Sequence, residues 1–267
     1  MGIRSEVFPE NGKMIRMRDL DMYYEVQGDG LPLIFIHGGA GTHESWMEDV
    51  EFFKGEYRIY TPDNRGHGRT NNPSGGLSFE VMADDIAGFC AALQIQKPCV
   101  CGWSDGGQIA LELGIRHPDL PAALVLGAVS YMASKHIMAG LAAFGVRGPG
   151  DIDFEYVESE FPDMVAYYKV HHSHIYGDDY WRTLLTDLTR LWLTFEIDPE
   201  LLSRVTAPAL LLIGDRDEFN PLEHSVEMYR KLPDGHLAVV PGADHDYPVA
   251  HADDFCRMIR SFFQDHA

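Results

Sequence analysis

Eight short apolar runs constrain the fold of this chain more than any other feature of its sequence. Amphipathic segments of helix length separate most of these runs. This alternation is typical of a mostly parallel sheet with helices on its faces. The sequence therefore predicts an α/β fold with an eight-stranded, mostly parallel sheet flanked by helices. The expected strands lie in MIRM, MYYEV, PLIFIHG, YRIYTPD, PCVCGW, AALVLGAV, PALLLIGD and HLAVVPG.

The first two runs differ from the later ones in their pattern. They alternate polar and apolar residues and are joined by a short turn at Arg18 and Asp19, which predicts a hairpin. Later runs are almost continuously apolar, as expected for strands that are buried on both faces. Cys99 and Cys101 alternate on one of them, so we expect both thiols on one side of a strand, reduced and in the core.

Helix signals lie between the expected strands. Ser78 is a favourable N-cap for a helix whose apolar residues share one face. A second helix is expected to begin at Ser104 and to end before Pro118, because proline cannot continue a helix.

Residues 131–204 break the alternation, because this segment has helical periodicity and no strand-like run. We expect a helical cap inserted after the sixth strand, with residues 1–130 and 205–267 forming the core. Such a cap would cover an active site and leave a small apolar pocket of roughly 300 Å³. Most of its aromatic side chains are expected only to pack the cap onto the sheet. One stripe at helical spacing consists of Trp181, Leu184, Leu185, Leu188, Leu191 and Trp192.

The charge of the chain argues against two classes of partner. Its 267 residues include 21 Lys and Arg against 41 Asp and Glu, a formal net charge of −20. Nucleic acids and anionic membrane surfaces bind clustered basic side chains, so neither is expected as a partner. No stretch approaches 18 consecutive apolar residues, and the N-terminal segment lacks the apolar core of a secretory signal. These features favour a cytoplasmic protein and leave its oligomeric state open.

Ser104 lies in Gly102-Trp103-Ser104-Asp105-Gly106, which fits the pattern G-x-S-x-G. The pattern follows an expected strand and precedes an expected helix, which is the context of a nucleophile at a strained turn. Gly102 and Gly106 would let the strand and the helix approach closely. We therefore interpret Ser104 as a candidate nucleophile rather than as a simple helix cap.

A serine hydroxyl needs a general base, and the base needs a carboxylate that fixes its tautomer. Where the nucleophile lies at a strand-to-helix turn of this kind, the chain order is Ser, acid, His. Asp215 and Asp217 follow the seventh expected strand, and His245 follows the eighth after a glycine-containing loop. Ligands bind at the carboxyl ends of parallel strands. These positions predict His245 as the base and leave both aspartates as candidates for the acid.

An acyl-transfer site also needs hydrogen-bond donors for the oxyanion. One candidate is the backbone N–H of Asp105, which follows the candidate nucleophile. The loop HGGAG, residues 37–41, follows the third expected strand and would supply the second donor from Gly39 or, as the alternative, from Ala40. His37 is expected to brace this loop rather than to transfer protons.

Five motifs occur in the order seen in serine hydrolases of the α/β-hydrolase superfamily: HGGAG, PDNRGHGRT, GWSDGG, GDRDEF and GADHDYP. Apart from the expected cap, the chain resembles this superfamily throughout. It is similar to small capped esterases and lactonases and to biphenyl-hydrolase-like hydrolases of amino-acid esters. The resemblance implies a triad of Ser104, Asp217 and His245, because the family spacing places the acid at Asp217. It also implies a structural loop at residues 63–69, in which Asn64 differs from many relatives.

The resemblance implies hydrolysis of small carboxylic esters or lactones through an acyl-enzyme, with a small-molecule ester as partner and without a cofactor or a metal. A serine nucleophile argues against epoxide hydrolases and dehalogenases, which use aspartate at this position. A C–C bond hydrolase or a cofactor-free perhydrolase would use the same triad, so both remain alternatives. A ligand receptor that keeps the triad but turns over slowly is an alternative from another functional class.

Two further features have both a chemical and a structural interpretation. His171, His172 and His174 could form a metal cluster, but adjacent histidines point to different sides of a helix, and we expect a solvated cap loop. Asp105 could attract a cationic group of a substrate, although an acid in the first turn of a helix is also stabilised by the helix dipole. The dipole interpretation is favoured, and a bias toward neutral or cationic substrates stays a weaker expectation.

Overall fold

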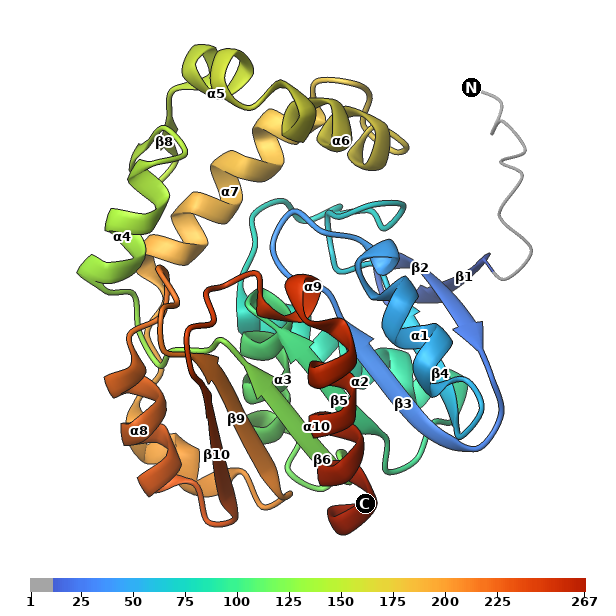
Figure 1. Ribbon diagram of the computed structural model, residues 1–267. Coiled ribbons are helices and arrows are strands. Elements are labelled where there is room, and N and C mark those ends of the chain that lie inside the picture. Colours follow the sequence, from blue (N-terminus) through green and yellow to red (C-terminus); the bar gives the residue numbers. More distant parts are fainter. Residues whose placement is uncertain (1–11) are drawn as a thin grey trace.

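The computed structural model of this chain describes residues 12–267 (Figure 1). Residues 1–11 lie outside the described part, and the prediction that the N-terminal segment is no secretory signal falls there. Within residues 12–267, no helix is both long and apolar enough to span a bilayer.

One sheet contains the eight predicted strands, in the order β1-β2-β4-β3-β5-β6-β9-β10. The β1–β2 and β2–β4 pairs are antiparallel, whereas the other neighbours in the sheet are parallel. The predicted α/β fold with an eight-stranded, mostly parallel sheet is therefore confirmed. The strand bounds are β1 (Gly12–Met17), β2 (Leu20–Gln27), β3 (Leu31–Ile36), β4 (Tyr57–Pro62), β5 (Cys99–Trp103), β6 (Ala123–Gly127), β9 (Ala209–Gly214) and β10 (Gly235–Val240).

The burial of each strand explains its sequence pattern. β1 and β2 form the predicted hairpin, and Arg18 in their two-residue turn adopts a φ of 49°. β5, β6 and β9 are buried along their whole length, because helices cover both faces of the central sheet. Cys99 and Cys101 are buried free thiols in the same core cluster, as predicted.

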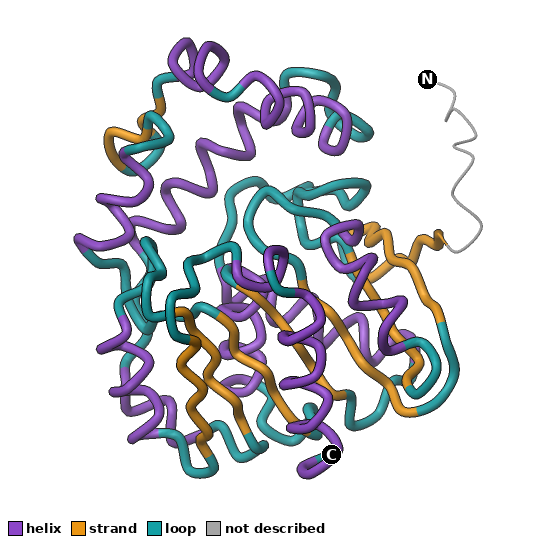
Figure 2. The backbone as a smooth tube through the Cα atoms, in the orientation of Figure 1, coloured by secondary structure: helices purple, strands orange, loops and turns teal. Residues whose placement is uncertain are grey.

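Helices cover both faces of the sheet and make three layers (Figures 1 and 2). α2, α3 and α8 pack with one apolar cluster, and α1 and α10 pack with the cluster on the opposite face. Ser78 caps α2 as predicted, since its Oγ accepts the backbone N–H of Val81 at 3.2 Å. The helices of the core are η1 (His43–Trp46), α1 (Met47–Phe53), α2 (Phe79–Leu93), α3 (Asp105–Arg116), η2 (Pro199–Arg204), α8 (Leu222–Lys231), α9 (Tyr247–Ala250) and α10 (Ala252–His266).

A cap formed between β6 and β9 lies over the carboxyl ends of the central strands (Figure 1). The expectation that this segment contains no strand is wrong for one short hairpin, β7–β8. These strands are too short to show a period of two in the sequence. The cap elements are α4 (Lys135–Ala142), β7 (Val146–Gly148), β8 (Asp151–Ile152), α5 (Phe154–Glu160), α6 (Pro162–His172) and α7 (Tyr180–Thr194).

The apolar stripe of α7 holds the cap together. Trp181, Leu184 and Leu188 are almost fully buried and form a cluster with Val157 and Val165 of the neighbouring cap helices. Trp192 ends the stripe and is only half-buried. The stripe predicted from the sequence therefore folds onto the cap, while its last aromatic residue faces the core.

The chain enters and leaves the cap side by side. Met132 pairs with Glu196 in an antiparallel bridge, and the N–H of Ile197 donates to the carbonyl of Tyr131 at 2.7 Å. Beyond this ladder, η2 packs against α3, and its Leu202 is fully buried in the core cluster around that helix. The expected cap, residues 131–204, included this helix, although its contacts are with the core. The ladder fixes the base of the cap against the carboxyl edge of the sheet.

Candidate active site

Ser104 lies at the sharp turn between β5 and α3. Its φ of 56° and ψ of −124° are unusual for any residue with a side chain, so the turn is strained. The backbone N–H of Ser104 donates to the carbonyl of Gly127 at 2.9 Å, which ties the turn to β6. This geometry agrees with the strained turn predicted for a nucleophile.

Two glycines make this turn possible, as the sequence predicted. A Cβ at Gly102 would lie 2.0 Å from the carbonyl oxygen of Gly106, and one at Gly106 would lie 1.9 Å from that of Ile36. Both distances are far below van der Waals contact with backbone atoms that cannot move independently. Strand and helix therefore approach each other as closely as they do only because both positions are glycine.

His245 and Asp217 form a hydrogen-bonded pair beside Ser104. Nδ1 of His245 lies 2.8 Å from Oδ2 of Asp217, whose side chain is fully buried. The other carboxylate oxygen accepts the backbone N–H groups of Phe219 at 2.9 Å and Asn220 at 2.8 Å. These contacts fix the carboxylate, and the carboxylate fixes the imidazole ring.

The two partners shift each other's pKa values. Burial disfavours the charged form of His245, but the hydrogen bond to Asp217 and its negative charge outweigh burial, and the pKa of His245 is raised. Burial alone would raise the pKa of Asp217, but the hydrogen bonds of its carboxylate and the charge of His245 outweigh burial and lower this pKa. Asp217 is therefore ionised at neutral pH and would stabilise an imidazolium at His245.

Asp215 lies in a different environment. Its Oδ1 accepts the backbone N–H of Gly242 at 2.6 Å, which joins the loops after β9 and β10. The sequence pattern left both aspartates as candidates for the acid. In the structure Asp217 lies beside His245, whereas Asp215 makes its contact within the loops.

The glycine loop after β3 is braced as predicted. Nδ1 of buried His37 lies 2.7 Å from the carbonyl oxygen of Gly38, and its Nε2 accepts the backbone N–H of Asn64 at 2.9 Å. Burial lowers the pKa of His37 to about 4, so the ring is neutral. Asn64 also donates from Nδ2 to the carbonyl of His37 at 3.1 Å, a supporting contact that the sequence did not reveal.

Gly39 and Ala40, the two candidates for an oxyanion donor, have different surroundings. Gly39 lines the cavity beside Ser104, and a Cβ there would lie 2.5 Å from Cζ2 of Trp192 and 2.6 Å from Oδ2 of Asp105. Ala40 is buried in the cluster of the cap, and its carbonyl oxygen lies 2.9 Å from Nε2 of His172. Gly39 is thus the one of the two that lines the same cavity as Ser104.

The side chain of Asp105 is buried next to Ser104. Its Oδ1 accepts the indole N–H of Trp192 at 2.7 Å, which connects α3 of the core to α7 of the cap. Burial raises the pKa of Asp105 to about 7, against the opposing effects of Trp192 and the nearby His245. Asp105 therefore belongs to the cavity as well as to the first turn of its helix, and the favoured dipole interpretation is incomplete.

The expectation of a solvated loop at the cap histidines is wrong for His172. This residue ends α6 and is 2% exposed, and its Nδ1 accepts the backbone N–H of Gly68 at 3.0 Å while Nε2 donates to the carbonyl of Ala40. In residues 12–267, no three His, Cys, Asp or Glu side chains are grouped to hold a metal ion. His172 instead joins the cap to two loops of the core.

Comparisons with known proteins identify the family of this chain. Residues 33–258 match the alpha/beta hydrolase family. This chain belongs to that family. The human serine hydrolase BPHL is 24% identical over 263 residues, covering 94% of this chain and 85% of the relative. A 2-hydroxy-6-oxo-6-(2'-aminophenyl)hexa-2,4-dienoic acid hydrolase of Metapseudomonas resinovorans is 22% identical over 265 residues, covering 96% and 91%.

A solved structure extends the likeness to three dimensions. The crystal structure of the esterase RhEst1 from Rhodococcus sp. ECU1013 superimposes with a TM-score of 0.76 at 20% identity, covering 96% of this chain and 100% of that one. At this identity the likeness shows the fold. Fold and family together make the chain a hydrolase of the α/β-hydrolase superfamily.

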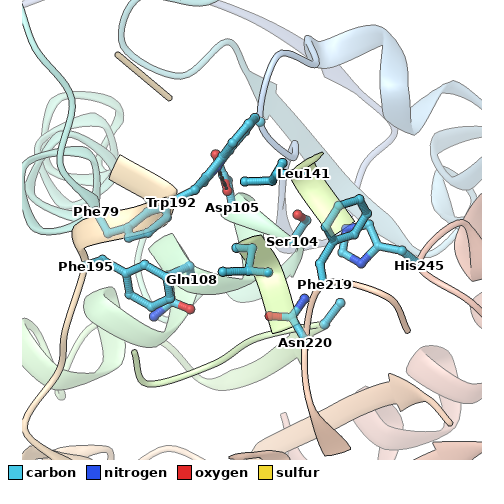
Figure 3. A pocket seen from close by; sticks show the side chains of 13 residues that line it. Phe79, Ser104, Asp105, Gln108, Leu141, Trp192, Phe195, Phe219, Asn220 and His245 are labelled. Carbon is cyan, nitrogen blue, oxygen red and sulfur yellow. Dashed lines mark hydrogen bonds between the residues drawn. The ribbon is translucent and has the colours of Figure 1, made fainter. Parts of the chain in front are cut away.

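An inner cavity of about 170 Å³ lies beside Ser104 in this hydrolase, between core and cap (Figure 3). It is smaller than expected because Leu141, Trp192 and Phe219 separate it from a second, apolar cavity of about 170 Å³ within the cap. His245 reaches the inner cavity from the opposite side to Trp192 (Figure 3). A wider outer groove of about 790 Å³ also reaches Ser104 and His245.

Sequence reasoning missed several residues that support this site. His136 of α4 places Nε2 2.9 Å from the backbone carbonyl oxygen of Asp217, and Trp103 donates its indole N–H to the carbonyl of His245 at 3.0 Å. Gln108, one turn after Asp105, also lines the inner cavity. The i, i+3 spacing of Asp105 and Gln108 on one helix was the only available signal.

Proposed function

We propose that this hydrolase cleaves small carboxylic esters or lactones through an acyl-enzyme at Ser104. One observation carries the proposal: Ser104, at a strained turn, shares a cavity with an imidazole whose tautomer is fixed by a buried carboxylate. An ionised Asp217 accepts the N–H of Nδ1, so Nε2 of His245 carries no proton and can accept one. A serine nucleophile requires such an acceptor.

In the first half-reaction, Oγ of Ser104 attacks the carbonyl carbon of the ester and its proton passes to Nε2 of His245. The backbone N–H groups of Gly39 and Asp105 would donate to the resulting oxyanion. When the carbonyl re-forms, the bond to the alcohol oxygen breaks, and that oxygen takes the proton from His245. Water then repeats the attack on the acyl-enzyme with His245 as base, and Ser104 regains its proton as the acid leaves.

The test is multiple turnover of p-nitrophenyl acetate, combined with labelling by a fluorophosphonate probe. We expect many turnovers per enzyme molecule in the wild type and loss of both turnover and labelling in Ser104→Ala. Ser225→Ala is a matched control, because Ser225 is a buried serine in α8, away from the cavity. A single slow burst without further turnover would contradict the proposal and support a ligand receptor.

A further inference from the structure

Two buried polar atoms in the wall of the inner cavity have no hydrogen-bond partner among residues 12–267: Oδ2 of Asp105 and Nε2 of Gln108. Asp105 is 6% exposed and Gln108 is 3% exposed. Both residues come from the first turns of α3, and Figure 3 shows both side chains at the cavity beside Ser104. Buried polar groups without partners are rare in proteins, so each of these atoms requires an explanation.

In each of these two side chains the other polar atom has a hydrogen-bond partner, and that bond fixes the orientation of the atom without one. Oδ1 of Asp105 accepts the indole N–H of Trp192 at 2.7 Å, so Oδ2 is left toward Gly39. Oε1 of Gln108 accepts the backbone N–H of Ser130 at 3.4 Å, so the amide nitrogen is the group without a partner. The cavity thus presents an acceptor and a donor that are held in place by the core and the cap.

The rest of the wall is mostly apolar. Phe79, Leu141, Phe195 and Phe219 contribute aromatic or aliphatic surface, which suits the carbon atoms of a small acyl chain. A purely hydrocarbon acyl group would leave both polar atoms buried and unpaired, which is unfavourable. An acyl group with a polar end would pair them.

We propose that the inner cavity is an acyl subsite that recognises a neutral group able both to donate and to accept hydrogen bonds, through Oδ2 of Asp105 and Nε2 of Gln108. A primary carboxamide is the simplest such group, since its N–H would donate to Asp105 and its carbonyl oxygen would accept from Gln108. The substrate class is therefore small esters or lactones of amide-bearing acids. This inference rests on the proposed esterase function.

The donor on Gln108 distinguishes this class from cationic substrates. An ammonium group would satisfy Asp105 but has no acceptor for the Gln108 amide. Because burial raises the pKa of Asp105 to about 7, part of the population is protonated at neutral pH and cannot pair with a cation as an ion. A carboxamide can bond to either form of the carboxyl group.

Isosteric methyl esters test the proposal without changing the leaving group. Methyl malonamate and methyl succinamate end in a carboxamide at two chain lengths, and methyl 3-methylbutanoate and methyl 4-methylpentanoate carry an isopropyl group in its place. Acid release in a pH-stat gives kcat/KM for each. We expect the carboxamide ester to exceed its isopropyl partner by about tenfold or more at one length at least, because a site built for hydrogen bonds rejects an analogue that lacks them.

Two variants connect the preference to the two atoms. Gln108→Leu removes the donor, and Asp105→Asn replaces the acceptor by a group that can donate, so each is expected to reduce the carboxamide-to-isopropyl ratio by about tenfold. Glu112→Gln is the matched control, because Glu112 is a buried carboxylate of the same helix outside the wall of the cavity. Its ratio is expected to equal that of the wild type, whereas general loosening of α3 would alter all three variants alike.

The outcomes separate this inference from the proposed function. Equal or better cleavage of the isopropyl esters at both lengths, with Ser104-dependent turnover of p-nitrophenyl acetate intact, would overturn the subsite and leave the esterase. Preference for the cationic methyl 3-aminopropanoate, abolished by Asp105→Asn and unchanged by Gln108→Leu, would also overturn it. Absence of any Ser104-dependent turnover would contradict the proposed function itself.

Discussion

Asp215 and Asp217 lie two residues apart, yet only Asp217 contacts the imidazole of His245. We expect Asp217→Asn to lower kcat for p-nitrophenyl acetate by about 10⁴, the loss that the same substitution causes in the chymotrypsin-type triad, where the imidazole takes the wrong tautomer. Asp215→Asn is expected to lose less than about tenfold, since that side chain bonds only within the loops. Near-wild-type turnover by Asp217→Asn together with an inactive Asp215→Asn would reverse the assignment.

The pKa of His245 determines how activity depends on pH. The general base acts in its neutral form, so kcat/KM should rise with pH through the pKa of His245 in the free enzyme. Because Asp217 raises this pKa, the midpoint is expected above the ordinary value of 6.5. Asp217→Asn should lower the midpoint, because the variant keeps the burial that disfavours the imidazolium and loses the hydrogen bond and the charge that oppose it most.

Burial raises the pKa of Asp105 to about 7, so the ionisation of this side chain would obscure the measurement. The pH profiles are therefore best recorded in an Asp105→Asn background, with Asp215→Asn as the control that should leave the midpoint unchanged. An unchanged midpoint on loss of Asp217 would show that the pair does not control the ionisation of His245.

At the scale of elements, the contact between β3 and α3 explains why Gly106 is a glycine. Alanine normally stabilises a helix by up to about 1 kcal/mol relative to glycine. At Gly106 the added methyl would lie 1.9 Å from the carbonyl oxygen of Ile36, so we expect Gly106→Ala to destabilise the protein by more than about 3 kcal/mol in urea unfolding. Gly88→Ala in α2 is the control, because its nearest neighbour is Sδ of Met17 at 3.9 Å. Equal stabilities of the two variants would contradict this explanation.

His172 connects α6 of the cap with two core loops, one of which carries Gly39. Removing both bonds in His172→Ala should increase amide hydrogen exchange in α6 and in residues 37–41 by about tenfold or more, because local opening loses two buried contacts. His171→Ala removes a neighbouring ring that contacts Glu44 at 3.6 Å and should leave exchange in residues 37–41 unchanged. Unaltered exchange in both segments of His172→Ala would show that the cap is held by other contacts.

The sequence predicted best those features that leave a local pattern. Each of the eight strands, the turn at Ser104 and the helix cap at Ser78 depends on neighbours within a few residues, and periodicity or glycine spacing reveals such features. The contact between Trp192 and Asp105 spans 87 residues, and that between His172 and Gly68 spans 104. Contacts of this kind depend on how the cap docks, which no local pattern records. His172 was therefore expected in a solvated loop, although it is buried.

At the scale of the whole molecule, the division of the interior should limit the length of the acyl chain that the proposed esterase accepts. The inner cavity holds about 170 Å³ and is closed toward the cap by Leu141, Trp192 and Phe219. We expect kcat/KM for p-nitrophenyl acetate or butyrate to exceed that for the dodecanoate, because a twelve-carbon chain does not fit this space. The comparison is made with the dodecanoate kept below its critical micelle concentration. A higher kcat/KM for the dodecanoate would indicate that long chains leave through the outer groove.

The wall between the two cavities also has a consequence for how the enzyme could diversify. Leu141 and Trp192 come from the cap and Phe219 from the loop after β9, whereas the turn at Ser104 is crowded by backbone atoms that tolerate no added carbon. A larger residue at either glycine of the turn should therefore impair folding, whereas truncation of Leu141 would join two existing spaces and add no atoms near the Ser104 turn. Single substitutions in this wall are therefore expected to change which substrates fit, with the backbone of the Ser104 turn unchanged.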